Sequence, residues 1–209
     1  MVTPNPPHPF NAEIETLASG ALLYRVHSNN FGPYEFNPGK GAPTRFAFFA
    51  DEHGATVPIL YAAAGQPAAV AESLLHDIPA TGGLMPYDTY APRVMSRLST
   101  SRPLRLGALH GLGLRALRVT AEQVTASAAS TYDRTVLWAK AAHRAGLDGL
   151  VWMSRQCNDT LAYAFFGDRC EGAFDRDPTF ARIFATGNDL LWLIDMCAPL
   201  GVDVLPPPA

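Results

Sequence analysis

Glu72 is the residue of this chain whose surroundings most strongly suggest chemistry. It lies in a run of small and apolar residues that extends from Ile59 to Leu75. A carboxylate removed from water destabilises the fold unless a cation or hydrogen-bond donors offset the loss, so carboxylates in such settings are often functional. We therefore take Glu72 as the first candidate for a catalytic residue. A paired or solvated carboxylate at the rim of an amphipathic helix is the structural alternative.

The neighbouring segments predict how Glu72 is positioned. Val57–Ala64 has the pattern of a buried strand, and Pro67 suits the first turn of a helix that would carry Glu72. The spacing of hydrophobic residues predicts the other strands and helices, and Gly146 marks the expected end of one helix. Strands are expected at Ala21–His27, Arg45–Ala50, Val94–Leu98, Arg102–Leu109, Leu150–Met153 and Leu161–Phe166, and helices at Ala121–Ala126, Thr131–Ala145 and Phe180–Met196.

The composition is that of an ordinary folded chain with one domain. It has 209 residues, of which 48% are hydrophobic and 17% charged, and its net charge is -3. This charge gives no reason to bind a nucleic-acid backbone, and the Arg-rich stretch from Arg93 to Arg118 is interpreted as a solvated face, with an anion site as the alternative. Since neither a signal peptide nor a membrane-spanning apolar run is seen, we expect a cytoplasmic protein with no direct nucleic-acid or membrane contact.

The cysteines and glycines exclude two common kinds of site. The three cysteines, Cys157, Cys170 and Cys197, are odd in number and lack the close paired spacing of zinc ligands, so we expect reduced thiols and no metal. A Gly-rich phosphate loop and a Rossmann fingerprint are also missing from the sequence. A nucleotide site in this chain would therefore have to use charged side chains.

Four short segments in a fixed order resemble the RES domain, a family of bacterial toxins from toxin–antitoxin pairs. They are Leu23-Tyr24-Arg25-Val26, Thr44-Arg45-Phe46, the block from Leu60-Tyr61-Ala62 to Glu72, and Asp148 to Ser154-Arg155. One departure is Phe46, where the family pattern has Trp. The resemblance implies an α+β fold similar to ADP-ribosyltransferases, a single domain with central β-sheets flanked by helices. It also implies residues 1–20 as a Pro-rich N-terminal extension, 21–176 as the RES domain, and 177–209 as a C-terminal helical segment packed on it.

The resemblance also implies roles for five residues in an enzyme that consumes NAD as its substrate and needs no cofactor. Arg25 and Arg45 would hold the diphosphate, Tyr61 would contact the nicotinamide, Glu72 would serve the reacting ribose, and Ser154 would complete the pocket. Glu72, Arg25 and Ser154 form the implied catalytic set, and Arg25, Arg45, Tyr61 and Ser154 the implied substrate-binding set. General chemistry agrees, since guanidinium groups suit diphosphates and a carboxylate stabilises an oxocarbenium-like centre.

The implied function is that of a toxin that breaks the ribose–nicotinamide bond of NAD, with water or inorganic phosphate as acceptor. The implied partner is an antitoxin with a DNA-binding helix-turn-helix of Xre type. Two alternatives remain open. The same pocket could transfer ADP-ribose to a protein, or the chain could bind a nucleotide or a partner without turnover.

Overall fold

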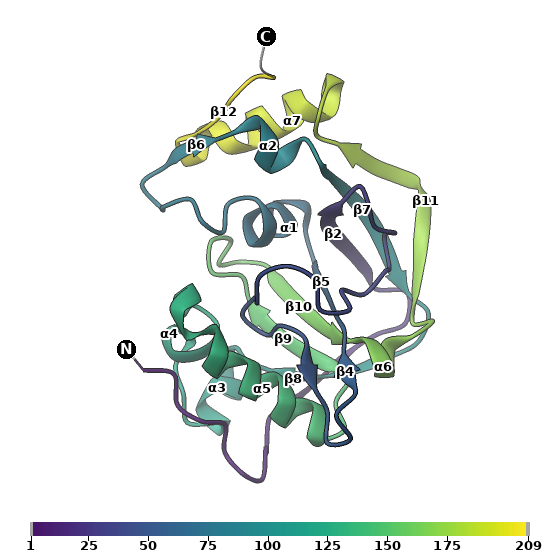
Figure 1. Cartoon of the computed structure of the whole chain (residues 1–209), viewed down its shortest axis with the longest axis vertical. Helices are drawn as coiled ribbons and strands as arrows, with labels where there is room; N and C mark the ends of the chain where they lie inside the picture. The colour runs from purple at the N-terminus through teal and green to yellow at the C-terminus, as the bar shows by residue number, and fades with distance from the viewer. Residues whose placement is uncertain (1, 208–209) are drawn as a thin grey trace.

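The computed structural model describes residues 2–207 and contains one large curled sheet with helices at both of its ends (Figure 1). The strands are β1 (Ile14–Leu17), β2 (Leu22–Ser28), β3 (Phe49–Ala50), β4 (Thr56–Val57), β5 (Ile59–Ala63), β6 (Gly83–Met85), β7 (Arg93–Thr100), β8 (Leu104–Ala108), β9 (Gly149–Met153), β10 (Leu161–Phe166), β11 (Phe174–Ile183) and β12 (Val202–Val204). The helices are α1 (Gln66–Ser73), α2 (Tyr87–Tyr90), α3 (Gly111–Ala116), α4 (Ala121–Val124), α5 (Tyr132–Arg144), α6 (Gly167–Cys170) and α7 (Gly187–Cys197), with two 3₁₀ turns, η1 (Ala129–Thr131) and η2 (Ala198–Leu200). The predicted fold class, with a central sheet flanked by helices, is confirmed.

The large sheet has eight strands in the order β1-β8-β9-β10-β5-β2-β7-β11. Strands β8 and β9 are parallel, and the chain joins them through α3, α4 and α5, as a parallel pair requires a long crossover. The other neighbours in this sheet run antiparallel. Two small sheets, β6 with β12 and β3 with β4, lie outside it.

The central strands β9 and β10 are almost entirely buried, which matches their near-continuous apolar sequences. Gly149 opens β9 at a point of close backbone approach, where an added Cβ would lie 2.2 Å from the carbonyl oxygen of Ala164. Only glycine fits there. The close approach holds β9 against β10, and Ser154 follows directly after the last residue of β9.

Two apolar clusters attach the helices to the sheet. At one end Trp138 of α5 packs into a buried cluster with Trp152 of β9. At the other end the small residues of α1 and the buried side of α7 form a cluster that includes Val70 and Leu193. Figure 1 shows α7, α2 and the β6–β12 pair above the sheet and α3, α4 and α5 below it. Helix α1 is therefore anchored at the α7 end of the sheet.

Both chain ends contribute more to the fold than a peripheral extension would. Strand β1, within residues 1–20, pairs with β8, and the indole N–H of Trp138 donates to the carbonyl of Pro4 at 3.0 Å. Residues 177–209 contain the end of β11, then α7, η2 and β12, so this segment is not purely helical. The predicted helix at Phe180–Met196 is wrong before Gly187, where α7 begins, because β11 continues to Ile183 and pairs there with β7.

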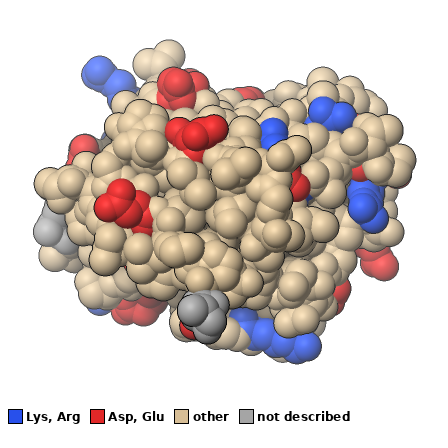
Figure 2. All heavy atoms as spheres, turned by 90° about the horizontal axis from the view of Figure 1, so that it is seen from above, with Lys and Arg blue, Asp and Glu red and all other residues tan. Residues whose placement is uncertain are grey.

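Charged side chains are dispersed over the α7 end of the molecule. Figure 2 shows isolated basic and acidic groups there, separated by uncharged surface. Within residues 2–207, no helix combines the length and the apolar character needed to cross a membrane.

Candidate active site

A cavity of about 390 Å³ lies beside α1, and four of the five predicted site residues line it. Arg25 comes from β2, Tyr61 from β5, Glu72 from α1, and Arg45 from the loop between β2 and β3. The fifth predicted residue, Ser154, does not line the cavity. It lies behind Glu72, directly after β9.

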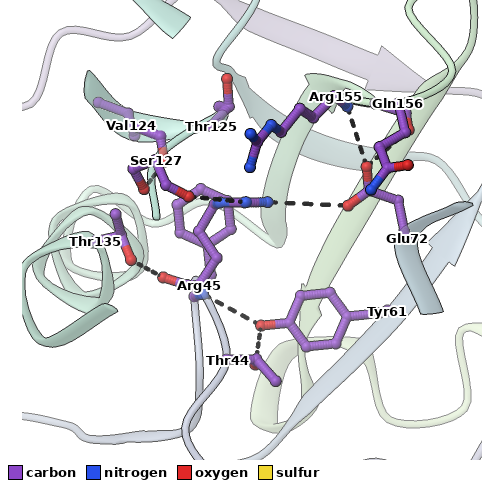
Figure 3. A network of polar contacts seen from close by, with 12 residues as sticks. Thr44, Arg45, Tyr61, Glu72, Val124, Thr125, Ser127, Thr135, Arg155 and Gln156 are labelled. Atoms are coloured by element: carbon purple, nitrogen blue, oxygen red, sulfur yellow. Dashed lines mark hydrogen bonds and ion pairs between the residues drawn. The ribbon is translucent and has the colours of Figure 1, made fainter. Parts of the chain in front are cut away.

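Glu72 occupies the last turn of α1, as its sequence predicts. Pro67 stands in the first turn of this helix, and the small residues Ala68, Ala69 and Ala71 are buried, so the helix approaches the sheet closely. The Glu72 side chain is 21% exposed, and its Oε2 lies 3.9 Å from Nη1 of Arg45. The carboxylate is therefore held close to a cation (Figure 3). It also remains open to the cavity.

Ser154 donates a hydrogen bond to the other oxygen of this carboxylate, Oε1. Its hydroxyl donates to Oε1 of Glu72 at 2.7 Å, and the backbone N–H of Arg155 donates to the same atom at 3.2 Å. Ser154 is fully buried, and its own backbone N–H donates to the carbonyl of Thr160. Oε1 is thus occupied by two protein donors, and Oε2 is the oxygen left for a ligand.

Ser154→Ala is expected to lower kcat for the reaction at this site by about tenfold, the scale of a lost supporting hydrogen bond, and to leave KM nearly unchanged. The hydroxyl contacts Glu72 and not the cavity, so its removal loosens the carboxylate without removing a ligand contact. Steady-state kinetics of the purified variant measure both constants. A rise in KM with an unchanged kcat would show that Ser154 contacts the ligand directly.

Arg45 was predicted on a strand, and this is wrong. The residue lies in a turn, because the hydroxyl of Tyr61 accepts the backbone N–H of Phe46 at 3.3 Å and contacts the hydroxyl of Thr44 at 2.8 Å. The Tyr61 hydroxyl thus accepts the N–H of Phe46, which in a strand would donate to the carbonyl of a neighbouring strand. The hydroxyl of Thr135 also donates to the Arg45 carbonyl.

The Arg45 guanidinium is almost enclosed, with its side chain 11% exposed. Its Nη2 donates to the carbonyl of Ser127 at 3.3 Å, and it lies 5.6 Å from the ring centre of Tyr132. Its Nε is buried and has no hydrogen-bond partner among the described residues. The guanidinium therefore has at least one donor, Nε, that no described residue satisfies.

Tyr61 faces the cavity with its ring and the loop with its hydroxyl. Its ring stands edge-on to Trp152, with centres 6.4 Å apart. Burial raises the pKa of the phenol to about 12, so Tyr61 is neutral at physiological pH. Its predicted contact with a nicotinamide ring stays a prediction.

Arg25 is a buried cation on the cavity wall, only 9% exposed. Its Nη1 donates to the carbonyl of Pro33 at 2.9 Å. Burial lowers its pKa to about 10, against the opposing charge of Glu35, so the guanidinium still carries its charge at neutral pH. A buried cation with one hydrogen bond is costly in the free protein, which suits a group that binds an anion.

His27 lies two residues further along β2 and also lines the cavity. Its Nδ1 is 2.9 Å from the carbonyl of Ser28, and its Nε2 is 3.0 Å from the hydroxyl of Ser96. Since a carbonyl only accepts, Nδ1 carries the proton and Nε2 accepts from Ser96. Burial is the main cause that lowers the pKa of His27, so the ring stays neutral.

This buried histidine should make the fold sensitive to acid. Because its pKa is lower in the folded state, His27 stabilises fully above its ordinary pKa of 6.5, and this stability is lost as the pH falls below that value. His27→Gln should cost about 1 kcal/mol at about pH 7.5 but reduce the fall in Tm between about pH 7.5 and 5.5. Thermal melts across this range measure the effect. His53→Gln, at an exposed turn, is the control, and an equal flattening in both variants would rule out His27.

Sequence reasoning missed several residues of the cavity. Tyr132 lines it although it was not singled out, and Arg93 lines it although its stretch was interpreted as a solvated face, with an anion site as the alternative. Strand register is the signal that finds Arg93, because β7 pairs it with Ser28 at the cavity end of β2. Arg97, by contrast, forms an ion pair with Asp177 at 2.6 Å, in keeping with a structural role for that part of the Arg-rich stretch.

Comparisons with known proteins identify the fold and the family of this chain. The chain is similar in fold to a chain in the crystal structure of the M. tuberculosis MbcT–MbcA toxin–antitoxin complex, with a TM-score of 0.59, 11% identity, and coverage of 88% of this chain and 92% of that one. No match is found among curated proteins. A family model described as RES domain matches residues 22–185, a span that contains every predicted site residue. The chain belongs to the RES domain family.

Proposed function

We propose that the chain is the toxin of a toxin–antitoxin pair and that it degrades NAD by cleaving the ribose–nicotinamide bond. The observation that carries the proposal is the cavity itself, where Glu72 and the cations Arg25 and Arg45 line one space of about 390 Å³. Volumes of this order are typical of small-molecule and cofactor sites. Membership of the RES domain family supports the same proposal.

The proposed chemistry follows from the charge that develops during bond cleavage. As the bond between the ribose C1 atom and the nicotinamide nitrogen breaks, its electron pair leaves with nicotinamide, which becomes neutral and needs no acid. The ribose carbon becomes cationic, and Oε2 of Glu72, which accepts no hydrogen bond from residues 2–207, stabilises it by charge. The charged guanidinium of Arg25 would hold the diphosphate.

The proposed partner is an antitoxin with an Xre-type helix-turn-helix that covers the cavity. The similarity in fold to a chain of a toxin–antitoxin complex supports the existence of a partner. We place the protein in the cytoplasm, where NAD is available to it, with no cofactor of its own.

Incubation of the purified chain with NAD, with and without phosphate, tests the proposal. Chromatography and mass spectrometry should identify nicotinamide together with ADP-ribose, if water is the acceptor, or with ADP-ribose phosphate, if phosphate is. A parallel reaction with labelled NAD and cell extract detects transfer to protein, the alternative function. Intact NAD in all reactions would favour a binding module without turnover.

A further inference from the structure

The candidate active site holds an excess of positive charge. Four cations and two carboxylates line the cavity of about 390 Å³, namely Arg25, Lys40, Arg45, Arg93, Glu35 and Glu72. A smaller cavity of about 60 Å³ adjoins it, and there two arginines face two carboxylates, so its charges balance. The excess in the large cavity favours a ligand with several negative charges.

Two of the four cations are offset by the two carboxylates of the large cavity. Nη1 of Arg45 lies 3.9 Å from Oε2 of Glu72. The charge of Glu35 opposes the effect of burial on the pKa of Arg25, and Oε2 of Glu35 accepts the backbone N–H of Gly32 at 2.9 Å. Both carboxylates are therefore already engaged, and neither is left for the other two cations.

Lys40 and Arg93 are the two cations that remain. Both are exposed, and neither forms an ion pair with any residue from 2 to 207. The two histidines of the lining leave this count unchanged, because burial lowers the pKa of His27, which stays neutral, and His76 lies 3.0 Å from Asp77. An exposed guanidinium without an ion pair keeps its fork of donors for an anion.

Short contacts place Lys40 and Arg93 on the same side of the cavity. Arg93 opens β7, where it pairs with Ser28 at the end of β2, and the carbonyl of Ser28 accepts the N–H of Phe31 at 3.1 Å. Nζ of Lys40 lies 5.6 Å from the centre of the Phe31 ring. The two cations therefore accompany an aromatic ring that is 36% exposed and lines the cavity.

This side of the cavity suits the adenosine half of a dinucleotide. Arg25, the predicted diphosphate ligand, precedes Ser28 by three residues on β2, so about 10 Å of strand separates the two residues. Long side chains at both ends can reach a ligand the size of one nucleoside. An exposed aromatic ring such as Phe31 stacks on a base, and an arginine near an adenosine ribose accommodates a 2′-phosphate.

We propose that Arg93 and Lys40 form a subsite for a phosphate on the adenosine ribose, so that the cavity accepts NADP and prefers it to NAD. This inference rests on the proposed cleavage of the ribose–nicotinamide bond. The third phosphate adds about 1.5 to 2 negative charges near pH 7, which matches the two cations that no carboxylate offsets. It lies on the other ribose, so the bond that breaks, the electron pair that leaves with neutral nicotinamide, and the acceptor are those proposed for NAD.

The test compares Arg93→Gln, Lys40→Gln and a matched control, Arg105→Gln, at an exposed position of β8 outside both cavities. Initial rates of nicotinamide release are measured against NADP and against NAD. In the unaltered protein and in the control, kcat/KM for NADP should be about tenfold above that for NAD, and Arg93→Gln should remove most of this ratio through KM. Lys40→Gln should reduce the ratio less, because an ammonium lacks the planar fork. Added salt should also lower it, because these charges are exposed.

Two outcomes would overturn the subsite while cleavage of NAD stands. One is a kcat/KM for NADP no higher than that for NAD, and the other is a ratio that Arg93→Gln leaves unchanged. Calorimetry with two ligands that lack nicotinamide, adenosine 2′,5′-bisphosphate and adenosine 5′-monophosphate, separates the two proposals. Tighter binding of the bisphosphate that is lost in Arg93→Gln, in a protein that leaves NAD and NADP intact, would keep the subsite and reject the proposed function. If the bisphosphate binds no more tightly and neither dinucleotide is consumed, both proposals fail.

Discussion

Glu72→Gln is expected to reduce kcat for NAD cleavage by about 100-fold or more, the usual cost of one contact made in the transition state. The substitution keeps an oxygen that accepts from Ser154 and Arg155 but removes the charge beside the ribose. The Arg45–Glu72 distance of 3.9 Å, at a partly exposed carboxylate, makes the ion pair worth less than about 1 kcal/mol, so Tm should change by only a few degrees. Rates of nicotinamide release and thermal melts of the same preparation measure both effects.

Glu13→Gln is the matched control for this substitution. Glu13 is exposed and lines neither cavity, so its variant should retain full activity. A Glu72→Gln protein that is folded and as active as the control would remove Glu72 from the mechanism. A loss of activity that follows a loss of folded protein would show a structural role instead.

Arg25→Met is expected to lower kcat/KM for NAD by about 30-fold while Tm stays the same or rises. A charge-assisted contact to a diphosphate is worth about 2 kcal/mol, which corresponds to this factor. Methionine keeps the apolar stem of a side chain that is 9% exposed, and it removes a buried charge whose pKa burial lowers to about 10. Removal of a poorly paired buried charge often does not destabilise a fold.

In Arg25→Met, kcat/KM for NAD should therefore fall while Tm does not. NAD kinetics and thermal melts test the separation, and Arg25→Lys indicates whether charge alone is sufficient. A Tm lowered by many degrees with unchanged kcat/KM would assign Arg25 to the support of the Pro33 loop.

Local sequence patterns were sufficient to predict the elements that carry Glu72. Pro67 marks the start of α1, the apolar run before it forms β5, and Gly146 follows the end of α5 with a positive φ of 78°. These signals act over a few residues, so they do not depend on the rest of the fold. Arg25, Arg45, Tyr61 and Glu72, which the resemblance to the RES domain implied as site residues, line one cavity.

Contacts between distant segments could not be predicted in this way. The turn at Arg45 depends on the hydroxyl of Tyr61, and β11 extends to Ile183 because β7 lies beside it. Tyr132 reaches the cavity from a helix that no local pattern connects to Arg45. In each case a tertiary partner determines the local conformation.

The same distant contacts determine when the protein can become active during its synthesis. Glu72 receives its hydrogen bond from Ser154, which follows it by 82 residues, and Trp138 is joined to Pro4 across 134 residues. A ribosome that has released only the first half of the chain has therefore released Glu72 without Ser154 and Arg155, the residues that hold its carboxylate. The candidate site cannot be complete until β9 and the residue that follows it, Ser154, have emerged from the ribosome.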